Sequence, residues 1–199
     1  SAAAPYSGAE RSEFAERVLR EATRRGFDRA PRRGILGDCA QWIWNIAAEL
    51  FPSAVQIADR YHVKERLCVI SKGIHGTDHA QAKQWANLRH DELDAENIDA
   101  IIQALTEHSQ ICDEARKGID YFHNNRHRMR YVEFHAQGLC TSTGVVEAGC
   151  KVAIGERLKQ SGMHWTVRGA DAIIALRCSR LSGRFEDFGE RRSARGEVE

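Results

Sequence analysis

The sequence lacks the marks of several common protein classes. Its six cysteines form no CxxC pair and no zinc-ribbon spacing, so no structural zinc site is predicted. We expect them to be small buried residues of a protein in a reducing cytosol. No apolar run is long enough to span a bilayer, and the first residues do not have the pattern of a signal peptide. These absences favour a cytoplasmic protein that does not engage a membrane.

Motifs of several enzyme classes are missing as well. The sequence has no Gly-rich phosphate loop, no GxSxG elbow and no evident Cys–His nucleophile pair. Residues 123–127, HNNRH, have the spacing of a zinc-protease helix, but Asn124 stands where that mechanism needs a glutamate. A metalloprotease is therefore not expected. The chemistry that needs only scattered acids is metal-assisted phosphodiester cleavage, in which carboxylates from separate elements hold two Mg²⁺ ions.

Size and charge allow a nucleic-acid partner without requiring one. The 199 residues, 42% of them hydrophobic, suit one domain, or one domain with a sizeable insertion. The formal net charge is +1, but residues 78–114 hold nine acids against two bases, and residues 151–184 hold seven bases against two acids. The basic segment could contact a polyanion, although charge alone is equally consistent with solvated helix faces.

A strand, a helix and a strand follow one another early in the chain. Residues 34–38 and 54–59 have the short apolar pattern of buried strands, and residues 40–50 have helical spacing that ends before Pro52. This order predicts a βαβ unit with parallel strands. Two strands are too few for a complete sheet, so we expect further strands upstream or a borrowed edge.

Helical spacing dominates the rest of the sequence. It predicts helices over residues 10–27, 61–74, 79–93, 97–131 (one helix or two in tandem), 145–161 and 167–185. Residues 138–144 are expected to form a loop. The predicted class is therefore α/β with few parallel strands, mostly helical overall, with a large all-helical insertion.

Two acids end the predicted strands. Asp38 follows the first strand, and the carboxyl ends of parallel strands form the site crevice of open α/β sheets. Asp59 ends the second strand, and His62 follows three residues later. Each acid could instead cap the helix that follows it, and Asp59 with His62 does not by itself make a metal site.

Glu147 is the third acid of interest. It lies beside an apolar helical stripe that includes Val146 and Cys150, and it is expected to lie in a closely packed neighbourhood. Alternatively, Glu147 forms a surface ion pair with Lys151, one helical turn later, which would add only a few tenths of a kcal/mol to stability.

Two long stretches carry a resemblance to a known family. Residues 37–67, GDCAQWIWNIAAELFPSAVQIADRYHVKERL, and residues 124–188, from NNRHRMRY to FEDF, closely resemble bacterial insertion-sequence transposases of the Kra type. These are related to the Mutator-like group of DDE transposases, and the resemblance covers residues 10–188. It implies an RNase H-like catalytic domain interrupted by a helical insertion. The implied division is a partial core at 1–62, the insertion at 63–140, C-terminal core helices at 141–188 and a polar tail at 189–199.

The resemblance also implies roles for single residues. Asp38 matches the second acid of the catalytic triad and Glu147 the third, so both would be Mg²⁺ or Mn²⁺ ligands. Asp59 and His62 match positions where related enzymes carry a Cys and a His, and they are expected to support the site. Contacts to DNA are expected from Lys151, Arg157, Lys159, Trp165 and Arg168, although Trp165 fits a core position equally well.

The sequence departs from the family pattern at two points. Cys39 stands where glycine is expected after the second acid. Asp28 lies in a turn only ten residues before Asp38, so it does not match the first acid, and the chain is expected to be the C-terminal portion of a transposase. We therefore expect little strand cleavage by this chain alone.

Partners and location also follow from the resemblance. The implied partners are DNA, at element ends and target, and further copies in the complete transposase, located at the nucleoid in the bacterial cytoplasm. One alternative is a non-catalytic DNA-binding or dimerising remnant that modulates a full-length transposase. Another is a helical domain with no nucleic-acid role.

Overall fold

A computed structural model of the chain describes residues 12–159, 162, 164–183 and 185. The chain divides into two compact units, Ser1–Thr143 and Gly144–Glu199, and each is described here by itself. The described residues are mostly helical, with two parallel strands among them. The expected mostly helical α/β class is thus confirmed at this level. The division into a catalytic core and an inserted helical part stays a prediction.

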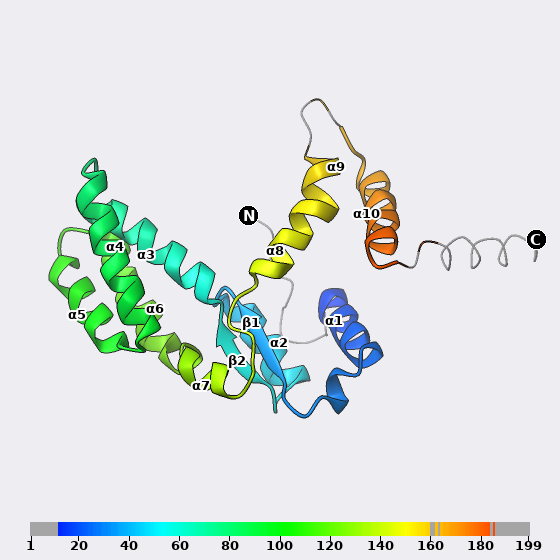
Figure 1. The fold of residues 1–199 in the computed structure, drawn as a ribbon, viewed down its shortest axis with the longest axis horizontal. Helices are drawn as coiled ribbons and strands as arrows, with labels where there is room; N and C mark the ends of the chain where they lie inside the picture. The colour runs from blue at the N-terminus through cyan, green and yellow to red at the C-terminus, as the bar shows by residue number, and fades with distance from the viewer. Residues whose placement is uncertain (1–11, 160–161, 163, 184, 186–199) are drawn as a thin grey trace, which may run out of the picture. The chain divides into compact units, whose positions relative to one another are not determined.

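The first unit opens with the expected strand–helix–strand order (Figure 1). Helix α1 spans Glu13–Arg24, and a short 3₁₀ turn, η1, spans Phe27–Arg29. They precede β1 (Gly34–Gly37), α2 (Gln41–Leu50) and β2 (Val55–Ala58). The strands pair in parallel from Gly34 with Val55 to Gly37 with Ala58, which confirms the predicted βαβ unit.

Helix α2 packs directly on β1 because Gly37 has no side chain. A Cβ atom at this position would lie 3.0 Å from Ile43 Cγ2 and 3.3 Å from the Trp44 ring. Both distances are tighter than ordinary carbon contacts, so a side chain at this position would require Ile43 and Trp44 to shift. This close packing holds the first turn of α2 against the end of β1.

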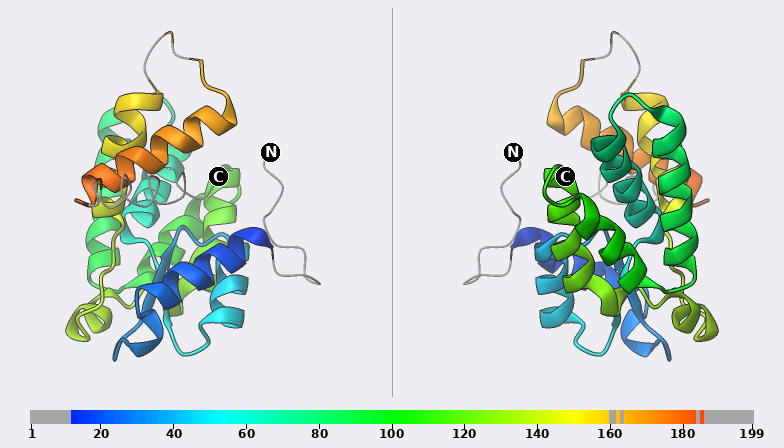
Figure 2. Two further views of the ribbon diagram at one scale, coloured as in Figure 1. Left: turned by 90° about the vertical axis from the view of Figure 1, so that its right-hand side faces the viewer. Right: turned by 90° about the vertical axis from the view of Figure 1, so that its left-hand side faces the viewer.

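Helices fill the remainder of the first unit. They are α3 (Arg60–His75), α4 (His79–Asp94), α5 (Ile98–His108), α6 (Asp113–Asn125), the 3₁₀ turn η2 (Arg126–Arg128) and α7 (Tyr131–Ala136). The range 97–131 contains α5 and α6 in tandem, followed by η2 and the start of α7. Helices α3 to α6 lie against one another as a layered group (Figure 2).

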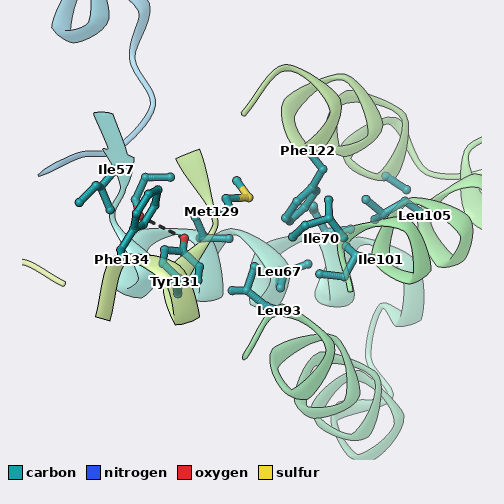
Figure 3. Close-up of a cluster of buried hydrophobic side chains, with 14 of the residues drawn as sticks. Ile57, Leu67, Ile70, Leu93, Ile101, Leu105, Phe122, Met129, Tyr131 and Phe134 are labelled. Atoms are coloured by element: carbon teal, nitrogen blue, oxygen red, sulfur yellow. Dashed lines mark hydrogen bonds between the residues drawn. The ribbon is translucent and has the colours of Figure 1, made fainter. Parts of the chain in front are cut away.

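The main core of the first unit joins these helices to the strands. Its fully buried side chains include Ile57 of β2, Leu67 and Ile70 of α3, and Phe122 of α6 (Figure 3). Tyr131 is also buried in this cluster, and its hydroxyl donates a hydrogen bond of 3.1 Å to the carbonyl of Ala58. The carboxyl end of β2 is therefore held by both apolar packing and a buried hydrogen bond.

The second unit has one interrupted helix and a final helix. Helix α8 (Gly144–Cys150) continues through a π-helical turn, η3 (Lys151–Gly155), into α9 (Glu156–Leu158), and α10 spans Val167–Leu181. Arg177 of α10 donates to the carbonyls of Val152 and Ala153 in the π-helical turn, at 2.5 and 2.8 Å. A π-helical turn leaves backbone acceptors misaligned with the helical ladder, and this guanidinium satisfies two of them.

Two expectations about burial are wrong. Cys112 is buried and Cys39 and Cys68 are partly buried, but Cys140, Cys150 and Cys178 are exposed. Val146 is 64% exposed, so the stripe beside Glu147 is not a buried one. Helical spacing identifies one face of a helix but does not say whether another element covers that face.

Candidate functional site

Asp38 lies at the carboxyl end of β1, and its side chain is exposed. Its Oδ1 accepts a hydrogen bond of 3.0 Å from the backbone N–H of Ala40, and Oδ2 has no partner among the described residues. Ala40, not Asp38, is the N-cap residue of α2. The carboxylate therefore holds the turn between β1 and α2 while keeping one oxygen available to a ligand.

The backbone after Asp38 adopts a left-handed conformation. Cys39 has a φ of 70°, which L-residues other than glycine rarely adopt. The expected glycine at this position thus has a physical reason, and Cys39 takes up that conformation at a cost in backbone strain. Its thiol packs toward the main core, and burial raises the pKa of the Cys39 thiol, with Tyr121 beside it acting in the opposite direction.

Asp59 is the most highly connected acid of the strand ends. Only 1% of it is exposed, and its carboxylate accepts hydrogen bonds from the N–H of Tyr61 (3.0 Å), the N–H of Thr143 (3.2 Å) and the hydroxyl of Thr143. It also lies 3.0 Å from His62 Nδ1. Burial by itself would raise the pKa of Asp59, but the bonds from Thr143, His62 and Tyr61 outweigh it and lower the pKa.

Hydrogen bonding to Asp59 sets the orientation of His62. Because the lowered pKa keeps Asp59 ionised at neutral pH, its oxygens can only accept, and His62 Nδ1 must carry the proton. The ring lies edge-on to Tyr61, with centroids 5.7 Å apart. Asp59 is also the N-cap of α3, so the capping interpretation is correct. Capping accounts for only one of the four side-chain interactions of Asp59, the bond from the N–H of Tyr61.

Asp38 and His62 open into the same groove of the first unit, of about 740 Å³. The groove runs along one face of α3, and the charged side chains that line it besides Asp38 are Lys64, Glu65, Arg66, Lys72 and Glu114. Arg66 stacks over the ring of Tyr121 at 4.3 Å, and Lys64 pairs with Asp94 at 2.7 Å. The groove is not predicted from the sequence. The spacing of polar residues in α3 by three or four positions does indicate that they share one face of the helix, which is the face that lines the groove.

Glu147 lies in α8, and its side chain is outside the described part of the structure. Of the two predicted triad acids, Asp38 therefore belongs to the first unit and Glu147 to the second. Among described residues, no cluster of three or more His, Cys, Asp or Glu could hold a metal ion. Asp38 fits one ligand position of Mg²⁺, which prefers carboxylate and water oxygens, but one carboxylate is only part of a site.

The five predicted DNA contacts all lie in the second unit. Lys151, in the π-helical turn, and Lys159 and Arg168 are exposed. Arg157 lies over the ring of Trp165 at 5.5 Å, so this tryptophan is a partner of a cation and not a fully buried core residue. Its indole N–H is shielded and has no hydrogen-bond acceptor among described residues.

No protein-family model, curated protein or solved structure matches the chain. The family resemblance therefore stays a prediction from the residues that carry it. Of the helices in the described ranges, none is long and apolar enough to cross a membrane.

Proposed function

We propose that the chain is the C-terminal portion of a DDE-type DNA transposase with a partial RNase H-like core. The observation that carries the proposal is the position of Asp38. Its exposed carboxylate lies at the carboxyl end of a parallel strand and opens into a groove, where open α/β sheets place their sites. The two long stretches that resemble Kra-type transposases, including Glu147 at the third acid, support the same function.

Each proposed residue has a role in this chemistry. In the complete enzyme, water attacks the element end, frees a 3′-hydroxyl, and that hydroxyl attacks the target strand. Asp38 and Glu147 would hold Mg²⁺ or Mn²⁺, which supplies charge stabilisation for the attacking and leaving oxygens. The exposed bases of the second unit would bind phosphates and position the DNA.

The open edge of β1 supports an incomplete core. The carbonyls of Arg33 and Gly37 accept hydrogen bonds from the β2 side. Because the backbone groups of successive residues in a strand point to opposite edges, the N–H and C=O groups of Gly34 and Leu36 point away from β2. These groups have no hydrogen-bond partner among described residues, and an apolar groove of about 370 Å³ lies alongside, lined by α1, α2 and β1. A further strand that carries the first acid can pair here, next to Asp38.

The alternative is a non-catalytic DNA-binding or dimerising remnant that modulates a full-length transposase. The exposed Lys151, Lys159 and Arg168 favour DNA binding that needs no complete triad. This alternative predicts the same binding but no contribution of Asp38 or Glu147 to cleavage when the missing acid is restored.

DNA binding is tested with a random-sequence duplex at a series of salt concentrations. We expect binding at low salt, and each lost phosphate contact should reduce the slope of log K against log salt by about 0.9. The triple variant Lys151→Ala, Lys159→Ala, Arg168→Ala should therefore lower the slope by about 2.7, if each base contacts one phosphate. A matched triple variant of bases in the first unit, Lys83→Ala, Lys117→Ala, Arg126→Ala, should leave the slope unchanged. Absence of binding at low salt would exclude both functions and leave a helical domain without a nucleic-acid role.

Cleavage is tested with Mg²⁺ or Mn²⁺ in the same mixtures. The chain alone should cleave little, because Asp38 and Glu147 bind metal weakly without a third carboxylate. Robust cleavage that Glu147→Ala abolishes would contradict the incomplete-core part of the proposal.

A further inference from the structure

Asp59 connects three segments that are distant in sequence. Its backbone N–H donates to the carbonyl of Gly37, the residue before Asp38, at 2.8 Å. Its side chain accepts from His62 within the same strand–helix junction. It also accepts two hydrogen bonds from Thr143, which is 84 residues away and directly precedes α8.

The contacts of Asp59 make this connection strong. An ionised carboxylate that is almost fully buried must have its oxygens satisfied, because an unpaired buried charge is highly unfavourable. Two of its four donors belong to Thr143, so the segment that enters α8 is part of what keeps Asp59 stable. In turn, Thr143 cannot move away without leaving that charge short of donors.

We propose that Asp59 is a positioning residue that couples the Asp38 end of β1 and the ring of His62 to Thr143, the residue that directly precedes the Glu147-bearing helix. The inference rests on the proposed function, in which Asp38 and Glu147 act at one site. A residue with only a capping role would support α3 through Tyr61 and would have no effect on the segment that enters α8.

Asn is the informative replacement at position 59. It keeps the size of the side chain but is uncharged and has a single acceptor oxygen, so it cannot accept from Tyr61 at one position and from His62 and Thr143 at the other. Thr143→Val removes only the hydroxyl donor and keeps the backbone N–H, and Thr143→Ser restores the hydroxyl. Asp94→Asn is the matched control, because Asp94 is also a carboxylate with a lowered pKa but bonds to Arg60 and Lys64 and not to Thr143.

Two measurements on the full chain test the proposal. Hydrogen exchange of residues 141–150, normalised to the core amides of α3, should accelerate about tenfold in Asp59→Asn, the effect of losing one charge-assisted bond. It should accelerate severalfold in Thr143→Val and return to normal in Thr143→Ser. Ring ¹⁵N shifts should show His62 with the proton on Nδ1 in the unaltered chain and in Thr143→Val, but no longer in Asp59→Asn. Asp94→Asn should change neither reading.

The outcomes separate this inference from the proposed function. Exchange of residues 141–150 within twofold of the unaltered chain in both Asp59→Asn and Thr143→Val would overturn it, as would an equal acceleration in Asp94→Asn. If Asp59→Asn does not fold, the Thr143→Val and Thr143→Ser pair decides on its own. Neither reading requires DNA, so a chain that fails to bind DNA would remove the proposed function and leave the coupling in place.

Discussion

The left-handed backbone at Cys39 leads to a prediction with an unusual sign. Glycine normally destabilises a protein relative to alanine, because it loses more conformational freedom on folding. At Cys39, with a φ of 70°, alanine would keep the strain and glycine would remove it. We therefore expect Cys39→Gly to be more stable than Cys39→Ala.

The magnitude can be estimated from the two opposing effects. Relief of the left-handed conformation is worth about 1.5 kcal/mol, and the extra entropy of unfolded glycine costs about 0.7 kcal/mol, so glycine should exceed alanine by about 0.8 kcal/mol. Relative to the natural residue, alanine should lose about 1 kcal/mol because the partly buried sulfur atom no longer packs. Glycine should then lie close to the unaltered chain in stability.

Urea denaturation measures these differences, with m-values compared to confirm that the unfolding transition is unchanged. Ala48, an exposed residue inside α2, is the control, because its helical backbone gives glycine no advantage and Ala48→Gly should lose about 0.7 kcal/mol. The reasoning is refuted if Cys39→Gly is less stable than Cys39→Ala by as much as Ala48→Gly is less stable than the unaltered chain.

Three further predictions concern buried groups of the first unit. The pKa of Asp59 is lowered in the folded chain, so the stability that its ionised form contributes is present above its unfolded pKa and is lost as the pH falls through its folded pKa. The difference in unfolding free energy between the unaltered chain and Asp59→Asn should therefore shrink from about pH 5 downward. A difference that stays constant with pH would argue against an ionised Asp59. Tyr131→Phe should lose about 1–2 kcal/mol in chemical denaturation, because the buried carbonyl of Ala58 loses its donor; a change under a few tenths of a kcal/mol would mean that this bond contributes nothing. In Gly118→Ala the Cβ would lie 2.9 Å from Ile70 Cδ1, so overpacking should outweigh the helix-propensity gain of about 0.5–1 kcal/mol and leave a net loss of about 0.5–2 kcal/mol; a gain in melting temperature would contradict this packing.

Local patterns account for what could be predicted of the fold. Short apolar runs bounded by turn residues gave both strands and their parallel pairing, and helical spacing gave α3 and α4 to within a few residues. Helical spacing does not decide between one helix and two over residues 97–131, because Ser109 and Cys112, at the interruption between α5 and α6, are not strong helix breakers.

The candidate site was less predictable because its decisive contacts are not local. Asp59 and His62 could be selected from their position at a strand end, but nothing near them in sequence indicates that Thr143 completes the arrangement. Asp38 lies at a strand end as predicted, whereas its capping alternative is wrong in detail, because the N-cap residue of α2 is Ala40. The backbone path through a turn depends on how both flanking elements pack, and the sequence shows which residues form the turn but not that packing.

The open edge of β1 also has consequences for handling the protein. An unpaired strand edge is a template for pairing between copies, and a short apolar strand such as Gly34–Gly37 is exposed to that hazard whenever the chain is concentrated. Arg32 and Arg33 stand directly before it, where charged residues act as gatekeepers against aggregation. We therefore expect these two arginines to keep the edge of β1 from pairing with further copies of the chain at high concentration.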